Sequence, residues 1–198
     1  ATRWPKTDLA LMAVALLLYV VGVADPHVAI GVSAAGVALN ALTALAGHAR
    51  AGRVRWPCAT LFAVTGAAGA WVGSSVAKMI DGHQLLLIFA VAMAAVGLSM
   101  LRPRVVVVRP EPTLTLAMAP RVGLAGAGVG SAAGFFGIGG GFLIVPGLMA
   151  STGMSLATAQ ATSLLSVAAF GATTAGNYAL SGWVDPTLVA AMTAGGVI

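Results

Sequence analysis

Charge is scarce in this chain of 198 residues: only 8% of the residues are Asp, Glu, Lys or Arg, whereas 59% are hydrophobic. A typical soluble domain carries about 25% charged residues, which keep its surface hydrated. A soluble fold would need a large core with almost no polar surface around it. The composition therefore argues against a soluble protein and indicates a chain that lies mostly in lipid.

Groups that catalyse reactions or bind metals are also scarce. There is one cysteine, Cys58, so the chain forms no internal disulfide. The carboxylates and histidines lie at the ends of apolar stretches, with no carboxylate pair and no metal-ligand spacing. Gly137-Ile138-Gly139 follows no strand, so a dinucleotide-binding motif is excluded by its context. We therefore expect no enzyme activity, no cofactor and no metal site.

Long uncharged stretches recur along the whole chain. A membrane-spanning helix needs about 20 mostly apolar residues. The stretches predict an all-α, polytopic helical membrane protein that crosses the lipid bilayer several times. The expected spans lie near 9–24, 28–47, 56–77, 84–101, 122–150, 156–179 and 186–198.

The basic residues give this protein a predicted orientation. Nine of the ten lie at the N-terminus or in two loops, and only Lys78 lies on the other side. By the positive-inside rule, the N-terminus and the loops at 49–55 and 102–121 lie in the cytoplasm. The outward loops are then those near 25–27, 78–83 and 151–155, and the 180–185 turn faces inward if span 122–150 crosses once. The net charge of +5 reflects this topology and does not indicate nucleic-acid binding.

Two predicted spans, 28–47 and 156–179, resemble each other at a spacing of 130 residues. Each ends in a short turn that contains glycine, Gly52 in the first copy and Gly182 in the second. The copies are four spans apart, an even number, which predicts a parallel duplication. If the glycine-rich segment is instead a re-entrant hairpin, the parity changes and the repeat is inverted. The other matches include Ala29 and Ala159, Ser33 and Ser163, Val37 and Val167, and Thr43 and Thr173.

The repeat divides the chain into two related halves of about four helices each, residues 1–110 and 111–198. The second half ends before its fourth span, and the glycine triplet at 139–141 has no counterpart near 8–10. We therefore expect a truncated piece of a longer protein, which lacks part of its first element and its last one or two helices.

The stretch Gly134–Pro146 is the most informative part of the sequence, because it places glycines at 137 and 139–141 inside a charge-free run from Val122 to Val184. Glycine lowers helix stability by roughly 1 kcal/mol relative to alanine. One interpretation is close helix contact with a kink at Pro146. The other is a helix broken in the second half, whose next segment begins near Gly141 and binds an anion with its free N–H groups.

Small and polar residues also form a stripe on each copy of the repeated span. The first runs through Ser33, Gly36, Asn40, Thr43 and Gly47, and the second through Ser163, Ser166, Phe170, Thr173 and Asn177. Such stripes are typical of close helix packing, and the alternative is that part of each lines a polar path. The candidate substrate-binding residues are Gly137, Gly139, Gly140, Gly141, Thr162, Ser163, Asn40 and Asn177.

These segments resemble the TauE/SafE sulfite exporter family, also called the 4-toluene sulfonate uptake permease family. The resemblance covers nearly the whole chain and is strongest at Gly134–Pro146, Ala159–Ser163, 25–31, 48–56 and 66–78. It implies an inner-membrane transporter of seven to eight helices in two related halves. The implied substrates are sulfite, sulfonates and other small sulfur-containing anions. This chain departs from the family where the first-half glycine motif is absent and where Val32 replaces a frequent threonine.

The sequence therefore predicts a secondary transporter or facilitator that exports a small sulfur-containing anion. Its expected partners are that anion and lipid, without nucleic acid, and a homo-oligomer stays among the options. The alternative is a non-transporting membrane assembly subunit, which would bind stable partners. A membrane enzyme is a more distant rival, whose activity would depend on Asp25, His27, His48 or Asp185.

Overall fold

The computed structural model describes residues 26–100, 118–137 and 141–197, and every regular element within these ranges is an α-helix. The helices are α2 (Pro26–Arg50), α3 (Trp56–Ala77), α4 (Gly82–Met100), α5 (Ala119–Phe136), α6 (Gly141–Thr152), α7 (Leu156–Ala179) and α8 (Pro186–Val197). Three of them, α2, α3 and α7, are long and apolar enough to cross a membrane. The predicted all-helical, polytopic fold is thus confirmed, whereas the expected span 9–24 lies outside the described residues.

The ends of α2 and α7 are built alike, as the repeat predicts. Gly52 follows α2 with a φ of 65°, and Gly182 follows α7 with a φ of 75°. This left-handed conformation closes a helix and costs least at glycine. Both glycine N–H groups donate back to the last turn of their helix, to the carbonyl oxygens of Ala49 and Ala179. The matched glycines therefore perform the same local role in both copies.

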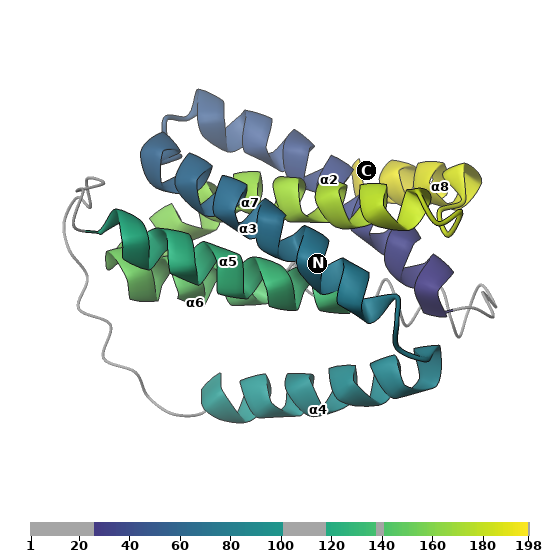
Figure 1. Cartoon of the computed structure of the whole chain (residues 1–198). Helices are drawn as coiled ribbons and strands as arrows, with labels where there is room; N and C mark the ends of the chain where they lie inside the picture. Colours follow the sequence, from purple (N-terminus) through teal and green to yellow (C-terminus); the bar gives the residue numbers. More distant parts are fainter. Residues whose placement is uncertain (1–25, 101–117, 138–140, 198) are drawn as a thin grey trace.

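Helices α3 and α5 pack side by side along two rows of glycine (Figure 1). Gly66 and Gly73 of α3 lie against Gly130 and Ser131 of α5. Contacts further toward the C-terminal end of α3 involve residues further toward the C-terminal end of α5, so the two helices run parallel. Where glycines face each other, the helix backbones approach until only hydrogen atoms separate them, as is common between helices in lipid. This contact fixes the position of α5 and therefore of Gly137, which follows it.

Helices α5 and α6 fold back on each other as a hairpin. A Cβ atom built on Gly147 of α6 would lie 3.0 Å from Cγ2 of Val129 in α5. Val129 lies seven residues before the end of α5 at Phe136, and Gly147 lies six residues after the start of α6 at Gly141. Two residues about equally far from the break can meet only if the helices run antiparallel. The single crossing expected at 122–150 is therefore wrong, and the hairpin alternative describes the structure.

The hairpin reverses the direction of the second repeat copy. Gly31 of α2 packs on Tyr178 of α7, and Ala34 packs on Gly171, so α2 and α7 run antiparallel. The repeated spans are thus related by inversion, and the parallel duplication expected from a single crossing is wrong. Helix α6 is also short, since its 12 residues measure about 18 Å, against about 30 Å of hydrocarbon.

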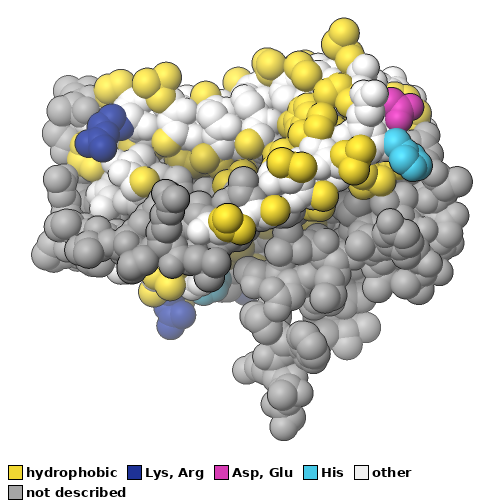
Figure 2. Space-filling view, turned by 90° about the horizontal axis from the view of Figure 1, so that it is seen from below, with side chains coloured by type: hydrophobic (Ala, Val, Ile, Leu, Met, Phe, Trp, Pro, Cys, Tyr) yellow, Lys and Arg dark blue, Asp and Glu magenta, His cyan; other side chains and the backbone are white. Residues whose placement is uncertain are grey.

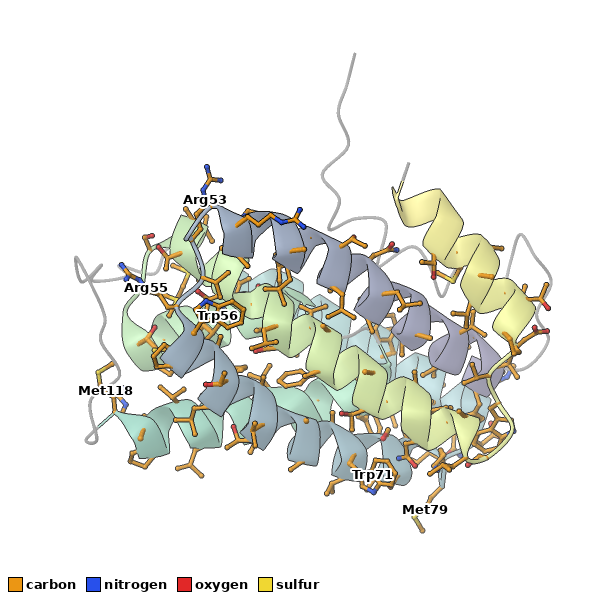
Figure 3. The ribbon with its side chains drawn as sticks, turned by 90° about the horizontal axis from the view of Figure 1, so that it is seen from above. Arg53, Arg55, Trp56, Trp71, Met79 and Met118 are labelled. Atoms are coloured by element: carbon orange, nitrogen blue, oxygen red, sulfur yellow. The ribbon has the colours of Figure 1, made fainter. Side chains whose placement is uncertain are left out.

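The two ends of the helix bundle differ in charge. Figure 3 places Arg53, Arg55 and Met118 at one end and Met79 at the other. Among the side chains coloured in Figure 2, most between the ends are hydrophobic or uncharged, basic ones lie toward one end, and an acidic side chain lies beside a histidine at the other. Exposed apolar side chains such as Leu87 on α4 and Leu124 on α5 fit a lipid-facing surface.

Two loops lie at the ends opposite to those predicted. Helices α3 and α7 are parallel, because the backbone of Arg55 contacts Thr162 near their starts and Lys78 contacts Asn177 near their ends. The loop before α7, at 151–155, therefore shares the arginine-rich end. The 180–185 turn shares the end of Lys78, whose ammonium donates to Ser181 Oγ at 3.0 Å. Both corrections follow from the hairpin, because α6 returns the chain to the end of the bundle at which α5 begins.

Candidate functional site

The helix break lies where the glycines predict it. Gly137 closes α5 with a φ of 67°, and its N–H donates to the carbonyl oxygen of Ala133 at 2.9 Å. A Cβ atom at this position would collide with the side chain of Ile30 on α2. Backbone conformation and space thus both require glycine at 137. Gly139 and Gly140, which the sequence also proposes as binding residues, lie outside the described residues.

The second arm of the break begins at Gly141, against the middle of α7. A Cβ atom built on Gly141 would lie 3.9 Å from Cγ2 of Val167, which is halfway between Leu156 and Ala179. The first N–H groups of an α-helix have no acceptor within the helix and carry positive partial charge. The start of α6 therefore presents backbone donors at the depth of the bundle interior, as the broken-helix interpretation requires.

The hollow beside this break is apolar. It is small and lies where α5 ends, near α2 and α4. The side chains around it carry no polar atom, and the rings of Phe89 and Phe136 meet at a tilt of 58° with their centroids 5.6 Å apart. The lining residues are Ile30, Leu85, Leu86, Phe89 and Phe136.

Thr162 and Ser163 are buried but serve the helices themselves. The backbone N–H of Arg55 donates to Thr162 Oγ1 at 3.2 Å, so a side chain of α7 accepts a hydrogen bond at the start of α3. Ser163 Oγ donates to the carbonyl oxygen of Gln160, one turn earlier in α7, at 2.9 Å. Within the described residues, neither hydroxyl forms a hydrogen bond with Gly137 or Gly141. The structure therefore does not bring this part of the predicted site together.

Replacing Thr162 with valine should lower the stability of the protein by about 1 kcal/mol, because the isosteric side chain removes one hydrogen-bond acceptor. Thr162→Ser keeps the hydroxyl and should retain this hydrogen bond. Thermal unfolding in detergent measures the difference. Thr173→Val is the control, since the Thr173 hydroxyl bonds only to Ala169 of its own helix, at 2.8 Å. Equal stability of Thr162→Val and wild type would contradict the structural role.

Asn177 lies at the centre of a buried polar cluster, and it is only 3% exposed. Its amide nitrogen donates to Ser74 Oγ at 2.6 Å and to Ser75 Oγ at 2.9 Å, both on α3. Its amide oxygen accepts from Lys78 Nζ at 2.7 Å. An amide in an apolar bundle needs such partners. The sequence identifies Asn177 as polar but does not show that Lys78, 99 positions away, is its partner.

Asn40 differs from Asn177, because its amide oxygen is buried without a hydrogen-bond partner. The backbone carbonyl of Asn40 accepts from Thr43 Oγ1 at 2.7 Å, which is a local bond within α2. One turn earlier on the same stripe, Gly36 packs against Met192 of α8, so this part of the stripe is a helix contact. The stripe therefore combines packing positions with one unsatisfied polar atom.

Two further buried hydroxyls without a partner lie on α7. Ser166 Oγ and Thr174 Oγ1 belong to fully buried residues and have no hydrogen bond, although buried hydroxyls usually find one. They flank Phe170, which packs against Gly66 of α3. The stripe predicted from sequence spacing contains Ser166, but it contains Thr173 instead of the buried Thr174. Nothing in the sequence separates these adjacent threonines, since only the packing of α7 shows which one points inward.

Comparisons with known proteins agree on a transporter family. The family described as Sulfite exporter TauE/SafE matches residues 9–198. A "Probable membrane transporter protein" of Xylella fastidiosa strain Temecula1 is 47% identical over 189 residues, which cover 95% of this chain and 72% of that protein. Its counterpart in strain 9a5c is similar to the same extent. No solved structure matches the chain. By its family match over nearly its whole length, the chain belongs to the TauE/SafE sulfite exporter family.

Proposed function

We propose that this protein is a secondary transporter or facilitator that exports small sulfur-containing anions, such as sulfite and sulfonates, across the bacterial inner membrane. The family description supports the substrate class, and the printed name of the Xylella relatives supports membrane transport. The observation that carries the proposal is the helix break between Gly137 and Gly141, whose second arm begins against the middle of α7. A span broken at such depth exposes backbone groups that can bind a solute.

The chemistry of this break suits an anion. Within the described residues, lysine and arginine lie at the ends of the bundle, so no cationic side chain in its middle is available to bind an anion. The start of α6 supplies N–H donors and positive partial charge instead. The proposed binding groups are the backbone at Gly137 and 139–141, with the hydroxyls of Ser166 and Thr174, which have no other partner.

The membrane potential favours the proposed direction. An inside-negative potential drives one negative charge outward by about 2.3 kcal/mol per 100 mV. Export of a monoanion then needs no coupled proton, and no carboxylate in the middle of the described bundle is available to carry one. The proposed orientation places the arginine-rich end and the N-terminus in the cytoplasm. In that orientation, Lys78 and Asn177 lie at the outer end.

Anion flux through proteoliposomes tests this function. Wild-type protein should release trapped sulfite or a small sulfonate faster than empty liposomes, and Gly141→Leu should lower that flux roughly tenfold or more, a barrier increase of about 1.4 kcal/mol. The leucine side chain would fill the space between Gly141 and Val167. Gly128→Leu is the matched control, because a Cβ atom at Gly128 meets nothing within 4 Å.

Two results would contradict the proposal. Full flux in a folded Gly141→Leu variant would remove the helix break from the transport path. A wild type that shows no flux for any tested anion, but copurifies with a stable membrane partner, would favour an assembly subunit instead.

A further inference from the structure

Lys78 is the one lysine or arginine that the described ranges place at the end opposite Arg53 and Arg55. It follows α3 directly, and its side chain is half-buried against the end of α7. Its ammonium donates to three neutral oxygens: Asn177 Oδ1 at 2.7 Å, the Asn177 carbonyl at 3.2 Å and Ser181 Oγ at 3.0 Å. Within the part of the chain that the structure describes, the positive charge is thus held in place by dipoles and makes no ion pair with a carboxylate.

The acidic side chains described at this end are engaged elsewhere. Asp81 Oδ1 accepts from the backbone N–H of His83 at 2.9 Å, at the start of α4. Asp185 Oδ1 accepts from the backbone N–H of Thr187 at 2.8 Å, at the start of α8. Each carboxylate therefore stabilises the first turn of the helix that follows it. Among the described residues, neither carboxylate therefore bonds to Lys78, and the lysine ammonium has only neutral oxygen acceptors.

The lysine also lies at the end of a line of polar side chains on α7. Asn177, its direct partner, is one turn beyond Thr174 and three turns beyond Ser166 in the same helix. Thr174 and Ser166 are the fully buried hydroxyls without hydrogen bonds. Residues separated by about one turn share a face of a helix, so this line leads from the depth of the break to Lys78.

We propose that Lys78, oriented by Asn177, is the outer binding site for the anion after it leaves the helix break. This inference rests on the proposed function and adds a residue and a location to it. The ammonium is a compact charge on a flexible stem with three donors, so an arriving oxyanion can replace one or more of its neutral acceptors. Asn177 keeps the empty site structured, because its amide also bonds to Ser74 and Ser75 of α3.

Two variants test the site in different ways. Lys78→Gln removes the charge. Asn177→Asp keeps the lysine but puts a carboxylate where the amide oxygen now lies 2.7 Å from Nζ, which cancels the charge in place. Both should weaken binding of sulfite to the purified protein about tenfold or more, measured by calorimetry or by the thermal shift that sulfite causes. Lys78→Arg should retain most of the binding.

The controls separate a binding role from a structural one. Arg53→Gln removes a positive charge from the opposite end and should leave sulfite binding unchanged. Sulfite exchange across right-side-out vesicles measures the half-saturating sulfite concentration on each side. Lys78→Gln should raise the half-saturating concentration of external sulfite, while that of internal sulfite stays within about twofold of wild type. A structural lesion would alter both sides together.

The outcomes distinguish this inference from the function on which it rests. If folded Asn177→Asp binds sulfite as tightly as wild type, the proposed outer site is wrong, whatever Lys78→Gln does. If wild-type vesicles show no flux but sulfite binding depends on Lys78, the proposed transport fails while the anion site stands. If wild type shows flux and both variants keep its external half-saturation, the transport proposal stands and the outer site fails.

Discussion

Replacing Gly130 with leucine should destabilise the protein by about 3 kcal/mol or more, at the upper end of the cost of overpacking a tight interface. A Cβ atom on Gly130 of α5 would overlap the backbone of Gly66 on α3. Backbone atoms cannot rotate away as a side chain does. The helices would have to separate, and the neighbouring contacts of Gly126 with Phe62 and of Gly134 with Ala70 would open with them.

Gly128→Leu provides the matched control for this prediction. It lies two residues away in the same helix and adds the same side chain, but a Cβ atom there meets nothing within 4 Å. It should unfold at nearly the wild-type temperature in detergent, whereas Gly130→Leu should show a large decrease or fail to assemble. Equal melting temperatures for the two variants would contradict the parallel glycine contact between α3 and α5.

The helix positions follow from the sequence because charge and proline mark where apolar stretches end. The expected spans 56–77 and 156–179 coincide with α3 and α7, and 28–47 lies within α2. Arg55 precedes α3, Lys78 follows it, and Pro186 begins α8. Apolar length and flanking charge are local properties, so they can be read without knowing the packing.

The hairpin could not be predicted with the same certainty, because its cause is not local. A glycine-rich interruption permits either a kinked crossing or a reversal, and the composition of 122–150 is the same in both. What decides is the glycine face of α5, which packs on α3 and leaves α6 to return beside it. The direction of the repeat and the sides of two loops depend on this single choice.

In the candidate site too, local features follow from the sequence, whereas contacts between helices do not. The glycine break and the polar character of Asn177 follow from the sequence. The pairing of Asn177 with Lys78 joins two helices, and the contact of Thr162 with Arg55 joins residues 107 positions apart. One sequence without packing information cannot supply such pairs. Nor can it show that Thr173 bonds to its own helix while the neighbouring Thr174 is buried without a partner.

A disulfide between α6 and α7 should abolish transport. The hollow beside the break is apolar, and a Cβ atom on Gly141 would already touch Val167, so we expect an anion to reach the start of α6 by separating α6 from α7 at this point. In Gly141→Cys/Val167→Cys, a Cβ at 141 would lie 3.9 Å from the position of Val167 Cγ2, so the side chains at these two positions are close enough to test for a disulfide. Native Cys58 is replaced with alanine so that only the new pair can react.

Oxidation of this pair should reduce sulfite flux to the level of empty liposomes, and reduction should restore it. The matched control is Gly36→Cys/Met192→Cys, which links α2 to α8 where a Cβ on Gly36 would lie 3.3 Å from the Met192 Cβ. That link leaves α6 free, so flux should continue after oxidation. If flux persists when mass spectrometry shows the 141–167 disulfide fully formed, the contact between α6 and α7 need not open. Anions would then cross by a route that does not include the start of α6.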